Sequence, residues 1–201
     1  MTLGINGGRN GLKGLNRKAL PKLRFRRQID PIPLVPAGLP KALDLGSGSN
    51  PKNIFSAREV WGVDFVANPQ RNVVAADLSA DPIPFPHESF AIISAHDFIE
   101  HIPRVSIGSG RTVFPFVELM NEIVRVLQPG GFFFSETPAF PASVAFQDPT
   151  HVNIITEDTF RLYFSGESWA GAYGFSGGLR FVAQKWNRGH LRTLMQKVEN
   201  R

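Results

Sequence analysis

A glycine-rich turn at residues 43–51 constrains the fold of this chain more than any other stretch. It reads LDLGSGSNP, a short apolar run that breaks into a loop. Gly46 and Gly48 let the backbone turn without side-chain clashes and approach a ligand closely, and Asp44 places a carboxylate at the end of the run. The pattern predicts the first strand of an α/β sheet that binds a nucleotide-like ligand.

The same loop favours one class of ligand. A dinucleotide fingerprint needs a third glycine, which Pro51 replaces here, and the Asp44 carboxylate would repel its pyrophosphate. A ligand that carries an ammonium and a sulfonium group would instead be attracted by that carboxylate. The loop therefore indicates S-adenosylmethionine (SAM) rather than NAD.

Two later apolar runs are also predicted strands that end in carboxylates. Asp64 closes the run at 60–65, 20 residues after Asp44, where α/β nucleotide sites place a carboxylate on the ribose hydroxyls. Phe65 could then lie on the adenine. Asp77, in the run at 73–78, is suited to accept from the adenine amino group.

Beyond residue 40, apolar runs alternate with connections, as a parallel sheet requires. The first connection, residues 50–58, is short for a helix, so we expect a compact crossover. The remaining pattern predicts strands at 90–95 and 131–135, helices at 116–127 and 156–164, and a closing antiparallel hairpin at 179–186 and 190–198.

Polar motifs follow the fourth and fifth predicted strands. HDFIEHI (96–102) and FQDPTHVN (146–153) are both expected at the rim where open α/β sheets bind ligands. His101 and His151 are the candidates for a general base, and Asp148 could orient His151. Each histidine could instead be a hydrogen-bonded structural residue.

The stretch 166–178 combines glycines with Trp169, Tyr173 and Phe175. It could line an acceptor pocket or form a lid. An ordinary connection with buried aromatic residues fits the pattern equally well.

Composition indicates one α/β domain plus an extension, because 201 residues with 42% hydrophobic content can bury a substantial core. The chain has no cysteine, which excludes disulfides, thiolate metal sites and a cysteine nucleophile. It shows neither a signal-peptide pattern nor a run of ~20 apolar residues. We therefore expect a cytoplasmic protein without a transmembrane segment.

Positive charge is concentrated at the amino terminus. Residues 1–30 hold eight lysines and arginines and one aspartate, whereas the net charge of the whole chain is +5. We predict a basic, Gly/Pro-rich arm and linker at 1–39 and the main domain at 40–201. The arm could bind nucleic acid, lipopolysaccharide or a membrane surface, or it could simply be solvated.

The motifs resemble those of class I SAM-dependent methyltransferases, in particular the small type 11 group. The resemblance runs from about Leu43 to Phe164 through LDLGSGSNP, GVDF, AADLSADPIPFPHESF, HDFIEHI, FVELMNEIVRVLQPGG and FQDPTHVNIIT. It implies a Rossmann-like, mostly parallel sheet of seven strands in the order 3-2-1-4-5-7-6, with helices on both faces and a C-terminal antiparallel hairpin. It also implies a SAM site made by Asp44, Gly46, Gly48, Asp64, Asp77 and Leu78, with His96 near the methionine end.

One part of the resemblance raises the question of a metal. If HDFIEHI starts a helix, Asp97, Glu100 and His101 share a face, and the later loop brings His151 to the same rim. This set is similar to the metal sites of small-RNA 2′-O-methyltransferases and is partly shared by ubiquinone-pathway O-methyltransferases. Glu-His at this point is also widespread in methyltransferases that need no metal, so we expect a metal-free site and keep the metal as the alternative.

The resemblance implies transfer of a methyl group from SAM to an oxygen or nitrogen of an acceptor. A small molecule, a sugar or a lipid intermediate is favoured, and the sequence identifies neither the acceptor nor the oligomeric state. Two alternatives stay open: a non-catalytic SAM-binding module in regulation or assembly, and a nucleic-acid methyltransferase that uses the basic arm. A dehydrogenase is disfavoured by Pro51 and Asp44.

Overall fold

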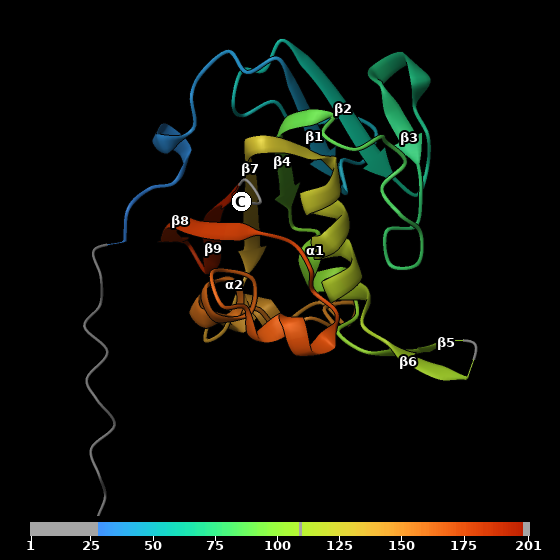
Figure 1. Ribbon diagram of the computed structural model, residues 1–201, viewed down its shortest axis with the longest axis vertical. Helices are drawn as coiled ribbons and strands as arrows, with labels where there is room; N and C mark the ends of the chain where they lie inside the picture. Colours follow the sequence, from blue (N-terminus) through green and yellow to red (C-terminus); the bar gives the residue numbers. More distant parts are fainter. Residues whose placement is uncertain (1–27, 109, 199–201) are drawn as a thin grey trace, which may run out of the picture.

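The computed structural model describes residues 28–108 and 110–198 and is built around one seven-stranded sheet (Figure 1). The strands lie in the order β3-β2-β1-β4-β7-β9-β8, which is 3-2-1-4-5-7-6 when they are counted along the chain within this sheet. The predicted fold class is confirmed. The bounds are β1 (Lys41–Leu45), β2 (Glu59–Asp64), β3 (Val73–Ala75), β4 (Phe90–His96), β7 (Leu127–Pro138), β8 (Leu179–Asn187) and β9 (His190–Lys197).

Strand direction fixes where a ligand site can form. The first five strands of that order pair in parallel, and β9 and β8 complete the sheet as an antiparallel hairpin. Because parallel strands end at one edge, the residues that follow β1, β2, β3 and β4 are brought together there.

Helices and turns connect the strands. The α-helices are α1 (Pro115–Val126) and α2 (Glu157–Tyr163), and the 3₁₀ turns are η1 (Ile32–Leu34), η2 (Pro69–Arg71), η3 (Ile99–His101), η4 (Ser143–Phe146) and η5 (Trp169–Tyr173). A second, two-stranded sheet, β5 (Ser106–Gly108) and β6 (Arg111–Val113), extends away from the body (Figure 1) and was not predicted. No helix of the described ranges is long and apolar enough to cross a membrane.

Both α-helices pack into one hydrophobic cluster with one face of the sheet. Met120 of α1 and Phe160 of α2 share this cluster with Ile93 and Phe133, which are all fully buried. α1 begins at Pro115, whose fixed φ suits the first turn of a helix. Successive strand residues point to opposite faces, so the neighbours of Ile93 and Phe133 face the other side.

The opposite face is covered differently from the prediction. Its cluster contains Ile92 and Phe134 of the sheet together with Val35 and Phe55, and no α-helix of the described residues contributes to it. The expected helices on both faces are therefore found on one face only. The reason is the connection between β1 and β2, which is too short and too interrupted by Pro51 to form a helix and crosses as an irregular segment instead.

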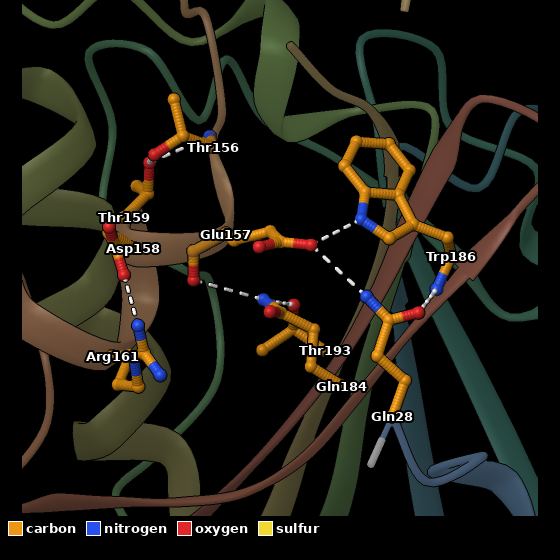
Figure 2. Close-up of polar contacts among 9 residues, drawn as sticks. All are labelled: Gln28, Thr156, Glu157, Asp158, Thr159, Arg161, Gln184, Trp186 and Thr193. Atoms are coloured by element: carbon orange, nitrogen blue, oxygen red, sulfur yellow. Dashed lines mark hydrogen bonds and ion pairs between the residues drawn. The ribbon is translucent and has the colours of Figure 1, made fainter. Parts of the chain in front are cut away.

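The segment before β1 is attached to the last strand of the sheet. Figure 2 shows the Glu157 carboxylate between the ring nitrogen of Trp186 and the side-chain amide of Gln28. The carbonyl oxygen of the Gln28 side chain accepts in turn from the Trp186 backbone N–H at 3.2 Å. Residue 28 is thus joined both to α2 and to β8.

Two further contacts extend this attachment. The Asp30 carboxylate lies 3.0 Å from the Lys185 ammonium, and Val35 is 9% exposed within the second-face cluster. Part of the predicted arm and linker (1–39) therefore packs on the sheet, while residues 1–27 lie outside the described ranges. The domain boundary itself stays a prediction.

The glycine loop after β1 needs both of its glycines, for different reasons. Gly46 and Gly48 have φ values of +64° and +58°, which side chains disfavour. A Cβ atom on Gly46 would overlap the ring of Phe98, whereas a Cβ on Gly48 would meet nothing within 4 Å. Gly46 therefore provides space for Phe98, and Gly48 provides only the turn.

This difference predicts unequal effects of two alanine substitutions. Gly48→Ala should lower the free energy of unfolding by about 1–2 kcal/mol, the cost of a left-handed residue with a side chain. Gly46→Ala should lower it by a further ~1–3 kcal/mol because Phe98 must move. Urea unfolding of both variants checks this, and equal losses would show that the Phe98 contact is unimportant.

Two truncations test the amino-terminal boundary. A chain that starts at residue 28 should unfold like the full chain, because the described contacts are kept. A chain that starts at residue 40 loses Val35 and the Asp30–Lys185 pair and should be less stable by about 2 kcal/mol or more. If the shorter deletion already prevents folding, residues 1–27 belong to the domain.

Candidate active site

A cavity of about 390 Å³ opens at the edge where the parallel strands end. This volume falls within the range of small-molecule sites. Six residues that the sequence assigned to a site line it: Gly46, Asp64, Phe65, Asp77, Leu78 and His101. The structure thus brings together the ends of β2 and β3, the glycine loop and one candidate base.

Asp64 links the glycine loop to the end of β2. Its Oδ2 atom accepts from the Gly48 N–H and its Oδ1 atom from the Phe65 N–H, both at 2.8 Å. Each carboxylate oxygen has a second lone pair, so Asp64 can still accept from a ligand hydroxyl. Phe65 is 71% exposed at the cavity wall, where its ring is available for stacking.

Asp77 and Leu78 form the wall beyond β3. The Oδ1 atom of Asp77 accepts from the backbone N–H and the hydroxyl of Ser79, at 3.0 Å and 2.6 Å. These bonds fix the orientation of the Asp77 carboxylate and leave its Oδ2 atom available to accept from a ligand or from solvent. Leu78 is buried and adds an apolar surface to the lining.

Two predicted cofactor residues, Asp44 and Gly48, shape the cavity without lining it. Asp44 is 1% exposed and accepts from the Lys52 N–H at 2.8 Å and from the Ser94 hydroxyl at 2.9 Å. Burial raises the pKa of the Asp44 carboxyl, although these two bonds act in the opposite direction. Asp44 holds the loop against β4, and Gly48 holds it against Asp64.

His96, predicted near the methionine end of the ligand, points away from the cavity. It is 8% exposed, its ring centroid lies 5.5 Å from that of Phe134 in the second-face cluster, and its Nδ1 atom lies 3.9 Å from the Glu136 carboxylate. Burial lowers the pKa of His96 to about 4, so the ring is neutral near pH 7. The side chain shares the strand face of Ile92, which explains its direction.

The sequence assigned no role to six lining residues, which are Val63, Ala76, Ser79, Phe98, Ile102 and Pro103, and it considered a seventh, Asp97, only as a metal ligand. Asp97 adopts φ +50° directly after β4, and its carboxylate lies 3.0 Å from the ring of His190 at the start of β9. For the six lining residues without an assigned role, a position within or beside the predicted motifs was the only signal in the sequence. The contact with His190 joins segments too far apart in sequence for a local pattern to reveal.

The two candidate bases are brought together by the loop at 146–153. The backbone N–H groups of Val152 and Asn153 both donate to the Glu100 carbonyl at 2.9 Å. The rings of His101 and His151 consequently lie edge to face, with centroids 4.9 Å apart. The expectation that both motifs share one rim agrees with this geometry.

Asp148 is linked through Thr150 to His101 rather than to His151, the histidine that it was expected to orient. Its Oδ1 atom accepts from the N–H and the hydroxyl of Thr150, at 2.8 Å and 2.6 Å, and the same hydroxyl lies 3.0 Å from Nδ1 of His101. His151 instead places its Nδ1 atom 3.3 Å from the Ala145 carbonyl. An aspartate readily bonds the backbone two residues on, and that turn directs Asp148 to Thr150.

Glu100 is a buried carboxyl beside both histidines. It is 1% exposed, its Oε2 atom accepts from the Thr137 hydroxyl at 2.7 Å, and its Oε1 atom has no hydrogen-bond partner among the described residues. Burial raises the pKa of the Glu100 carboxyl. One oxygen of Glu100 and one ring nitrogen each of His101 and His151 lie within 4.8 Å of one another.

These three groups could share a proton or hold a divalent cation. Asp97 does not join them, because its carboxylate is turned toward His190. The helix face expected for Asp97, Glu100 and His101 is absent, since only the short turn η3 forms there and Asp97 precedes it with a positive φ.

The stretch 166–178 is neither wholly core nor wholly exposed. Phe175 is buried in the first cluster, Trp169 is 58% exposed, and Tyr173 lines a second cavity of about 460 Å³. Both the structural interpretation and the pocket interpretation of this stretch therefore have support.

Comparison with protein-family models gives one match. Residues 43–135 match a model described as a methyltransferase domain, and this range contains the glycine loop and the whole lining of the first cavity. No curated protein shows a significant match to the chain.

Solved structures share the fold at low identity. A chain from the complex between the Haloferax volcanii Trm112 methyltransferase activator and a methyltransferase is similar with a TM-score of 0.55 and 13% identity, over 82% of this chain and 85% of that one. A Bacillus halodurans protein described as a methyltransferase gives 0.53 and 14%, over 82% and 95%. The cyclase SpnF gives 0.52 and 13%, over 83% and 77%.

At such identities the structures show the fold, and the family model supplies the assignment. Residues 43–135 thus match a methyltransferase domain, as the motifs indicated, and the fold is the one that these solved structures share.

Proposed function

We propose that the protein is an enzyme that transfers a methyl group from SAM to an oxygen or nitrogen atom of an acceptor. A small molecule, a sugar or a lipid intermediate is the favoured acceptor class. The observation that carries the proposal is a single cavity whose lining combines the carboxylates of Asp64 and Asp77 with the imidazole of His101.

The residues present fit the cofactor. Asp64 would accept from the ribose hydroxyls with its unused lone pairs, Phe65 would stack on the adenine, and Asp77 would accept from its amino group. Leu78 would provide the apolar contact. When bound, SAM supplies an electrophilic methyl group for in-line displacement by the acceptor.

The chain's own contribution to the chemistry is to position the acceptor and remove its proton. The Thr150 hydroxyl has one hydrogen, which the short bond to Asp148 uses. Its oxygen can then only accept from His101, so the proton of that ring is assigned to Nδ1. The other nitrogen, Nε2, is left with a free lone pair, as a general base requires.

A metal-assisted reaction is the alternative mechanism. Glu100, His101 and His151 would hold a divalent cation, and Thr137 would orient the Glu100 carboxylate from behind. Such an ion could bind an acceptor hydroxyl and lower its pKa, which would replace the general base.

Two further functions follow from other features. The lysines and arginines within residues 1–30 favour a nucleic-acid acceptor or an anionic surface, and all of them lie outside the described residues. A non-catalytic SAM-binding module has the same fold, which also occurs in a protein named as a cyclase. The histidine pair beside the cavity favours the enzyme over the module.

Asp64 provides the test of cofactor binding. Asp64→Ala should weaken binding of S-adenosylhomocysteine by roughly 1.5–3 kcal/mol, the scale for hydrogen bonds to a charged group. Asp64→Asn keeps the shape and one acceptor oxygen, so it should lose less. Titration calorimetry measures both, and unchanged affinity in the alanine variant, or tight NADH binding by the native chain, would contradict the assignment.

The catalytic residues can be tested once an acceptor is found by incubating the protein with methyl-labelled SAM and a fractionated lysate. Under the base mechanism, His101→Ala should lower kcat by about 10²–10⁴. Thr150→Val should lower kcat and Thr150→Ser should retain it, because only the hydroxyl fixes the ring proton.

The same assay separates the two mechanisms. Under the base mechanism EDTA has no effect, whereas under the metal mechanism EDTA abolishes turnover and Mg²⁺ or Mn²⁺ restores it. Full activity in both His101→Ala and His151→Ala would refute both mechanisms.

A further inference from the structure

The second cavity, of about 460 Å³, lies among α1, α2, η5 and the segment that leads into β5. It is as large as a typical small-ligand site. Its lining is dominated by aromatic side chains, of which the largest are Phe114, Phe116, Tyr163, Phe164 and Tyr173.

These aromatic residues divide into a fixed floor and an available wall. Phe116 and Phe164 are 5% and 2% exposed and belong to the core. Tyr163 and Tyr173 are 39% and 50% exposed, and the Tyr173 ring meets the Phe114 ring edge to face at 5.2 Å. The wall therefore offers ring surface on which a planar ligand could pack.

The second cavity adjoins the candidate active site. Pro103 lines the first cavity and Arg104, the next residue, lines the second, so the segment after His101 separates the two. Asn153, which is 1% exposed, accepts from Nε of Arg104 at 2.7 Å and donates to the Ile99 carbonyl at 3.0 Å. The loop that positions His151 therefore also positions Arg104.

Arg104 gives the second cavity a positive charge that is not fully paired. Its Nη2 atom donates to the Ile154 carbonyl, and no described residue accepts from its Nη1 atom. Asp158, the carboxylate in the same lining, is already paired with Arg161. A guanidinium with donors to spare favours an anionic partner, and a carboxylate is the group that its planar fork fits best.

We propose that this cavity binds the body of the methyl acceptor, and that the acceptor is a planar aromatic carboxylic acid. The inference rests on the proposed function and specifies its substrate class. The aromatic ring packs against Tyr173 and Phe114, the carboxylate pairs with Arg104, and the hydroxyl or amine to be methylated extends past Pro103 toward His101.

Calorimetry with two probes of one shape tests the binding chemistry. The full chain should bind 2-naphthoate about tenfold more tightly than 2-naphthol, because only the acid can pair with Arg104. Arg104→Gln should remove this preference and leave 2-naphthol binding unchanged, whereas Arg104→Lys should keep part of it. Tyr173→Ala should weaken binding of both probes about fivefold.

Phe146→Ala is the matched control, since Phe146 is an aromatic residue that is 57% exposed and does not line the second cavity. It should bind both probes like the native chain. An unchanged affinity for S-adenosylhomocysteine in the Tyr173 and Arg104 variants, together with a cooperative melting transition, shows that these variants are folded.

Three results would overturn the proposal. They are failure of both probes to bind, an undiminished preference for the acid in Arg104→Gln, and displacement of 2-naphthoate by S-adenosylhomocysteine, which would place the probe in the first cavity. Failure of the native chain to bind S-adenosylhomocysteine would instead refute the proposed function. The two failures are therefore distinguishable.

Discussion

The buried carboxylate of Asp44 is the interaction on which the candidate site depends. It joins β1 to β4 through Ser94 and holds the start of the crossover through the Lys52 N–H. Removing it would take this acceptor from the buried Ser94 hydroxyl, at a cost of about 1–3 kcal/mol, and from the part-buried Lys52 N–H at a smaller cost. With the loop fixed in this way, the Gly48 N–H meets Asp64, and the ends of two strands become one wall of a cavity. A residue outside the lining thus determines its shape.

The same short crossover explains why the segment before β1 belongs to the folded body. An α-helix between β1 and β2 would normally cover the second face of a doubly wound sheet. Here that face would expose Ile92 and Phe134 without the irregular crossover, which contributes Phe55, and the segment before β1, which contributes Val35. The contacts of Gln28 and Asp30 with β8 hold the start of this segment at the sheet edge. A domain boundary placed just before β1 therefore separates the preceding segment from the sheet on which that segment packs.

Local patterns predicted the strands of the main sheet and several residues of the cavity wall, because strand ends such as Asp64 and Asp77 are placed by the direction of their own strands, whereas the sheet order came from the family resemblance. They failed where a contact joins distant segments. The pairing of Asp97 with His190 and the route from Asp148 through Thr150 to His101 depend on how loops dock, which periodicity does not encode. The direction of His96 could have been inferred from the alternation along β4, in which it shares a face with the buried Ile92.

The two cavities differ in the sign of the charge they offer, and this difference supports a division of ligands between them. The first cavity is lined by Asp64, Asp77 and Asp97, which suit a ligand with cationic groups. The second offers Arg104, since its only carboxylate is paired. Each ligand would find like charge in the wrong cavity and opposite charge in its own. Pro103 lines the first, negatively charged cavity, and Arg104, the next residue, lines the second, positively charged one, so the two cavities meet at this pair of residues. His101, which would take the acceptor's proton, lines the first cavity two residues before Pro103.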